Sequence, residues 1–270
     1  MDYIRQQSRN DPETLWWEEA WRERELLFRD QFGETMPPNT VTAFYWDDIE
    51  IRIPGGCALT FSLNRGSRPV TLTLGHGLAQ PLSRNDADLP DGRSAFGWEF
   101  AILTRDQPQW RFEALYQLMT YVRQSRRRIE PGHRVPFTFC GDAEGRTSVE
   151  LGNVDLRPDS RPIEGAVAMV FWPLLGYPAE LRTSTGKFGI LVGTTISNSE
   201  LALAKMTSSQ HLLLLLLRCG IDQVSEIDRP SVLESERGAE EWATVKMLSA
   251  AEADLHLSRY AGNVKKPSVR

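Results

Sequence analysis

Apolar and polar residues alternate between residues 41 and 104, and this period of two constrains the fold more than any other feature of the sequence. The runs AFYW, IEIRI, CALTFSL and VTLTL are rich in β-branched and aromatic residues, and turn-forming groups separate them. In FGWEFAIL (96–103), the aromatic residues Phe96, Trp98 and Phe100 share one face of an extended strand, whereas Glu99 lies on the other. The pattern predicts several short β-strands, each with a buried face.

Before and after this region, apolar residues recur every three or four positions, which is the spacing of an amphipathic helix. A helix is expected over 12–32, with a buried stripe made of Trp17, Trp21, Phe28 and Phe32. A second helix is expected from Pro108 to about residue 128. The apolar runs 165–172 and 188–195 predict buried strands. A capping box of Ser197 and Glu200 then opens a third helical region, and the six leucines at 212–217 either continue it or form a separate helix.

Composition limits the class of protein. The chain has 270 residues, of which 41% are hydrophobic, and a net charge of −5. It can therefore bury a substantial core, and its charge does not favour nucleic acid or an anionic membrane as a partner. The first ten residues lack the apolar stretch of a secretory signal, the six leucines are too short to span a bilayer, and the three cysteines are widely separated. We expect a reduced, cytoplasmic protein.

No group of residues predicts catalysis, a metal or a cofactor. STGKFG (184–189) lacks the upstream glycine of a phosphate loop, and GHGLAQ (75–80) lacks the third glycine of a dinucleotide turn. A hydrolase would have to use His76 with Asp91 or Glu99, but no activated nucleophile accompanies them. The basic stretch RQSRRR (123–128) suits a solvated helix C-terminus, with an anion site as the alternative.

One segment resembles a known family. DGRSAFGWEFAILT (91–104) resembles the signature of the suppressor of fused domain family, in which an Asp-Gly-x-Ser loop leads into Phe-Gly-aromatic-Glu and an apolar strand. Other segments are similar to the family in the expected order. They are LTLGHGLAQPL (72–82), RFEALYQLMTYVRQSRRRIEPGHRV (111–135), STGKFGILVGTTISNSELALAK (184–205) and IDRPSV (227–232). The resemblance covers about residues 20–233.

The resemblance implies an architecture. The expected fold class is α/β (α+β), a single-domain sandwich with a central mixed β-sheet flanked by helices, which agrees with the alternating strands and amphipathic helices. Residues 1–233 would form the suppressor-of-fused-like domain, including the N-terminal helix. Residues 234–270 would form a C-terminal appendage with a short helix around Trp242 and Leu248 and a mobile tail.

The resemblance also implies a function, namely that of a non-catalytic protein-binding domain without a cofactor. Animal relatives hold a short peptide as an added strand, and many bacterial relatives are thought to be immunity proteins that neutralise toxins. This chain ends near the close of the animal proteins' first domain, which favours the bacterial role of binding a toxin partner. The alternative is a regulatory scaffold that captures a peptide of an endogenous protein by strand addition.

The implied partner-binding residues are Asp91, Gly92, Arg93, Ser94 and His76. Asp91 corresponds to the aspartate of the family motif that contacts the bound peptide in the animal relatives. The alternative is that Asp91 only forms a turn with Gly92. Neither alternative gives Glu99 a catalytic role.

Overall fold

The computed structural model of the chain describes residues 12–36, 45–46, 49–50, 57–65, 68–79, 92–106, 108–141, 147–152 and 161–262. The strands are β1 (Tyr45–Trp46), β2 (Ile49–Glu50), β3 (Cys57–Arg65), β4 (Arg68–His76), β5 (Arg93–Thr104), β6 (Arg134–Gly141), β7 (Thr147–Leu151), β8 (Arg161–Pro162), β9 (Ala166–Pro173), β10 (Leu181–Thr183) and β11 (Gly186–Ser197). The helices are α1 (Pro12–Phe32), α2 (Trp110–Ser125), α3 (Asn198–Met206), α4 (Ser209–Arg218), α5 (Glu236–Val245) and α6 (Ala250–Gly262), with a 3₁₀ turn η2 (Val232–Glu234).

One mixed sheet organises the fold. Its strands follow the order β3-β4-β5-β11-β9-β6-β7, with β10 paired to β11 and β8 paired to β6. β5 and β11 run parallel, and the other paired strands of this sheet are antiparallel. The strands β1 and β2 form a separate short hairpin. The predicted α+β fold with a central mixed sheet and flanking helices is confirmed.

Strand β5 separates two parts of the core. Trp98, Phe100 and Ile102 pack into the cluster that includes α2, and Phe96 packs against the edge of that cluster. Ala101 and Leu103 project to the opposite face, into the cluster that contains the aromatic residues of α1. The period of two in the sequence therefore assigned the faces of this strand correctly, because successive side chains of a strand point to opposite sides of the sheet.

The entry to β5 is irregular. Lys187 of β11 lies opposite Arg93, but Gly189, two residues later, lies opposite Trp98, so extra residues of β5 bulge out between these pairs. Gly97 has a φ of +80° within the bulge, a conformation that favours glycine. A Cβ atom on Gly189 would lie 2.2 Å from the ring of Trp98, so the indole can cross β11 only because no side chain stands there.

Helix α1 has the predicted bounds, but its buried stripe differs from the prediction. Phe28 and Phe32 are buried as expected, and Trp21 is half-buried. The side chain of Trp17 lies outside the described residues. Arg24 is fully buried between these aromatic positions, which the sequence analysis did not predict.

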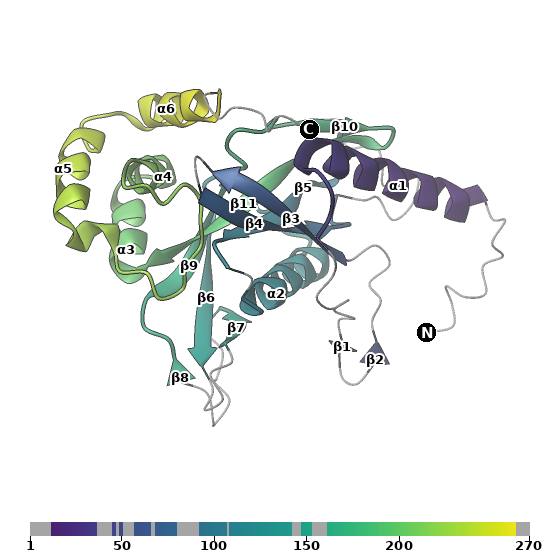
Figure 1. Cartoon of the computed structure of the whole chain (residues 1–270), viewed down its shortest axis with the longest axis horizontal. Coiled ribbons are helices and arrows are strands. Elements are labelled where there is room, and N and C mark those ends of the chain that lie inside the picture. The colour runs from purple at the N-terminus through teal and green to yellow at the C-terminus, as the bar shows by residue number, and fades with distance from the viewer. Residues whose placement is uncertain are drawn as a thin grey trace.

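Helices α3 to α6 gather at one side of the molecule, away from α1 (Figure 1). The six leucines form a helix of their own, α4, and all six are buried because the sheet and the other helices of this group surround them. Two helices, α5 and α6, stand where one short helix was expected. Val245, Ala253 and Leu257 from these helices join the leucine cluster, so residues 236–262 pack on the domain. The expected mobile tail beyond residue 262 lies outside the described residues.

Candidate functional site

The predicted partner-binding residues lie in different environments. Asp91 lies outside the described residues. Gly92 is exposed, and Arg93 at the start of β5 is half-buried. Ser94 and His76 are both fully buried, so neither reaches the surface of this structure. Of the predicted binding residues that the structure describes, a partner could therefore contact only Gly92 and Arg93 directly.

Glu99 binds the turn that follows His76. Its carboxylate is fully buried and accepts hydrogen bonds from the backbone N–H groups of Gly77, Leu78 and Ala79 at 3.0, 2.9 and 2.9 Å. Burial raises the pKa of the Glu99 carboxyl, while the guanidinium of Arg24 and the three amide donors act in the opposite direction. Glu99 thus holds the turn after β4 in place, which is a structural role.

Arg24 connects α1 to the residues around Glu99. We call the buried group of Arg24, Ser94, Glu99 and Thr185 the Arg24 joint. Its Nη2 donates to Ser94 Oγ at 2.7 Å and to Thr185 Oγ1 at 2.8 Å, and its Nη1 lies 4.0 Å from Glu99 Oε1. Burial lowers the pKa of Arg24 to about 10, against the opposing charge of Glu99. Ser94 Oγ in turn donates to the carbonyl of Ala79. Segments that are far apart in the sequence therefore meet around one buried guanidinium.

His76 belongs to this joint as well. Its ring stacks on Trp21 with centroids 3.7 Å apart and meets the edge of Phe28 at 5.3 Å. Burial, together with the charge of Arg24, lowers the pKa of His76 to about 3, so the ring is neutral. The hydrolase alternative would need His76 and Glu99 to reach a substrate, and both are closed off from solvent in this structure.

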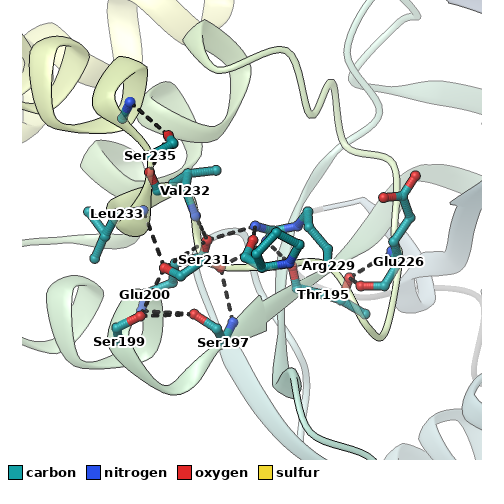
Figure 2. Close-up of polar contacts among 12 residues, drawn as sticks. Thr195, Ser197, Ser199, Glu200, Glu226, Arg229, Ser231, Val232, Leu233 and Ser235 are labelled. Carbon is teal, nitrogen blue, oxygen red and sulfur yellow. Dashed lines mark hydrogen bonds and ion pairs between the residues drawn. The ribbon is translucent and has the colours of Figure 1, made fainter.

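A second buried polar cluster joins the start of α3 to the segment before η2. Glu200 and Arg229 form an ion pair with Nη1–Oε1 and Nη2–Oε2 distances of 2.7 and 2.8 Å (Figure 2). Glu200 also accepts from the backbone N–H of Ser197, which completes the predicted capping box, and from that of Val232. Burial alone would raise the pKa of Glu200, but the bonds from Arg229 and these amides bring it below its ordinary value.

An open groove lies at the C-terminal end of α2, beside β6 and the end of β7. Its volume is about 610 Å³. The residues that line it are Tyr121, Arg127, Arg128, Ile129, Gly132, His133, Arg134, Val135, Pro136, Leu151 and Gly152. Half-buried or buried apolar side chains form part of the lining, and Arg127, Arg128 and Arg134 are exposed. The groove therefore combines apolar surface with positive charge.

Arg93, one of the predicted partner-binding residues, is linked to this groove through Glu130. Arg93 Nη1 lies 3.5 Å from Glu130 Oε2, and Trp98 Nε1 donates to the same oxygen at 3.0 Å. The backbone N–H of Glu130 donates to Nδ1 of His133, which lines the groove. Arg93 and the groove are thus neighbours, whereas the sequence predicts binding residues only in the loop at 91–94 and at His76.

Sequence reasoning missed the groove residues Tyr121, Val135 and Leu151. The available signal was the basic stretch RQSRRR followed by the GH turn. That stretch is typical of a solvated helix C-terminus, and Arg127 and Arg128 are indeed exposed there. Their place beside a groove follows from the packing of α2 against β7, which no local pattern encodes.

Among the described residues, no three His, Cys, Asp or Glu side chains come close enough to share a metal ion. None of the helices that the structure describes is long and apolar enough to cross a membrane.

Comparison with known proteins identifies the fold. Neither a protein-family model nor a curated protein matches this sequence. Among solved structures, Drosophila Suppressor of Fused matches with a TM-score of 0.54 and 15% identity, over 72% of this chain and 46% of that chain, so the match spans less than half of the Drosophila chain. A chain of the Sufu–Fu complex matches with a TM-score of 0.59 and 14% identity, over 84% of this chain and 96% of that chain.

A suppressor of fused homologue from Neisseria gonorrhoeae matches with a TM-score of 0.49 and 13% identity, over 79% of this chain and 97% of that chain. At such identities a structural match establishes the fold and leaves the function open. The first two matches and the mixed-sheet topology agree with the resemblance seen in the sequence. This chain has the suppressor of fused fold.

Proposed function

We propose that this chain is a protein-binding domain and that the groove beside α2, β6 and β7 receives a segment of its partner. The groove is the observation that carries the proposal, because it is open and offers both apolar surface and charge. The fold supports it, since one solved structure with this fold is a complex of Sufu with Fu.

The edge of the sheet suggests how a partner segment would bind. Residues 134–136 of β6 pair with β9 on one side, and β7 pairs with residues 137–141 on the other. β7 ends where the N–H of Gly152 donates to the carbonyl of Pro136. Among the described residues, no strand pairs with 134–136 on the β7 side. An extended partner segment would continue β7 there by strand addition.

The predicted loop residues Asp91, Gly92 and Arg93 would extend this surface. Arg93 lies next to the groove through Glu130, so a segment leaving the groove in that direction would pass the loop. Ser94 and His76 are not part of the proposed surface, because both are buried in the joint with Arg24.

For the cellular role, we propose neutralisation of a toxin partner, as the family resemblance implies for bacterial relatives. The second candidate is a regulatory scaffold that captures a peptide of an endogenous protein, and the Sufu–Fu complex favours it. A tagged pull-down from the native cell with mass spectrometry separates the two. Recovery of a toxin encoded by a neighbouring gene supports the first role, and recovery of an endogenous regulator supports the second.

Two matched variants test the groove itself. Tyr121→Ala removes a ring from the groove lining, and Tyr260→Ala removes an exposed ring from α6. Capture of the partner should fall with Tyr121→Ala and stay unchanged with Tyr260→Ala, while thermal melting shows that both variants fold. Equal capture by both variants would mean that the partner binds elsewhere.

A further inference from the structure

We propose that the groove selects acidic segments of a partner protein in which carboxylate and apolar side chains alternate. This inference rests on the proposed function of the groove and specifies the chemistry of its ligand. The positive charge of the groove contrasts with the net charge of the whole chain, which is −5.

Among the residues that the structure describes, no acidic side chain neutralises the positive charge at the groove. Arg127, Arg128 and Arg134 line the groove and are exposed, and no carboxylate of the described residues forms an ion pair with any of them. Glu130 is the acidic residue within this stretch of chain. Its carboxylate is already engaged by Arg93 and by the indole N–H of Trp98.

The helix end does not cancel this charge. The C-terminus of α2 points its last carbonyl groups toward this region, which corresponds to about half a negative elementary charge. Three guanidinium groups carry about six times that charge with the opposite sign. Guanidinium groups are suited to bind carboxylates in a planar, two-point geometry, so an acidic segment gains both charge neutralisation and hydrogen bonds.

The apolar lining distinguishes a peptide from a nucleic acid. Tyr121, Ile129, Val135 and Leu151 contribute apolar surface to the same groove. An extended peptide points successive side chains to opposite sides, so acidic residues can meet the arginines while apolar residues fill the groove. A nucleic acid backbone would satisfy the arginines but would leave most of the apolar surface uncovered. The net negative charge of the chain also opposes binding of a long polyanion.

Selection from a displayed library of random peptides about 12 residues long, which span about 40 Å when extended, tests the inference on the full chain. The wild-type protein should enrich peptides with an excess of Asp and Glu. The double variant Arg127→Glu/Arg134→Glu should lose that preference and bind a selected acidic peptide about tenfold more weakly or worse. The control Arg68→Glu/Arg259→Glu makes the same charge change at exposed sites on β4 and α6 and should behave as wild type.

The outcomes separate the inference from the proposed function. Enrichment of neutral or basic peptides whose binding is weakened by Tyr121→Ala would overturn the charge preference and leave the groove as a binding site. No enrichment, or enrichment that Tyr121→Ala does not affect, would overturn the proposed function and this inference together. Tighter binding of a short oligo(dT) than of any selected acidic peptide would show that the groove takes nucleic acid, and the inference would be wrong.

Discussion

Glu200 and Arg229 form a buried, two-point ion pair that joins the start of α3 to the segment before η2. Arg229 also donates to the carbonyl of Thr195 at the end of β11, so one side chain connects a strand, a helix and a loop (Figure 2). The two residues belong to segments, SNSEL and IDRPSV, that the sequence shows only as separate motifs. Together they fasten the start of α3 and the segment before η2 to the end of β11.

Removal of one partner of this ion pair should be costly. Arg229→Met should lower the free energy of unfolding by about 3–5 kcal/mol, because Glu200 would remain buried without its countercharge. Arg182→Met serves as the control, since Arg182 pairs with Glu180 at the surface and should contribute less than about 1 kcal/mol. Urea unfolding monitored by circular dichroism measures both values. Similar small losses in the two variants would contradict a structural role for the buried pair.

His76 should make the protein sensitive to acid. The pKa of His76 is about 3 in the folded protein and about 6.5 in an unfolded chain, so between these values the unfolded chain binds a proton that the folded protein does not. The free energy of unfolding should therefore fall as pH decreases below about 6.5, by at most about 1.4 kcal/mol per pH unit from this residue.

His76→Phe keeps an aromatic ring against Trp21 and removes the titration. Urea unfolding of the wild type and of this variant at about pH 7 and about pH 5 isolates the contribution of His76 from that of the carboxylates. The wild type should lose about 2 kcal/mol more than the variant over this interval. If the free energy of unfolding falls by the same amount in the wild type and in the variant, His76 is protonated to the same extent in the folded and unfolded states.

Helix α1 should be an integral part of the core. Phe28 is fully buried against Phe188 and His76, so Phe28→Ala should lower the free energy of unfolding by about 3–5 kcal/mol. Leu26 lies on the same helix with 59% of its surface exposed, and Leu26→Ala should change stability by less than about 0.5 kcal/mol. Chemical unfolding measures both values. If Phe28→Ala lowers the free energy of unfolding by less than about 1 kcal/mol, α1 does not contribute to the stability of the core.

Asp91 is predicted to contribute to partner binding through its charge. Asp91→Asn keeps the turn chemistry with Gly92 and removes the charge, so it should weaken capture of the partner by about 1–3 kcal/mol at unchanged melting temperature. Asp91→Ala is the comparison, because it removes both properties. Wild-type capture by Asp91→Asn, together with a lower melting temperature for Asp91→Ala, would identify Asp91 as a turn former only.

Local patterns in the sequence determined the elements and the faces that they bury. The period of two assigned the two faces of β5, and the capping box marked the start of α3. These predictions succeed because burial of one face imposes a repeat on neighbouring residues, and such a repeat can be read within a few turns or pleats. The resemblance added the order of the segments and the mixed sheet.

The tertiary structure alone decided what the polar residues do. Arg24 is buried because Ser94 and Thr185, which lie 70 and 161 residues away in the sequence, accept its hydrogen bonds. His76 and Ser94, predicted to bind a partner, are enclosed by the same joint. A charged side chain can be buried only when its partners surround it in space, and sequence separation carries no information about that. The groove has the same origin, since its arginines and apolar residues come together only where α2 packs on β6 and β7.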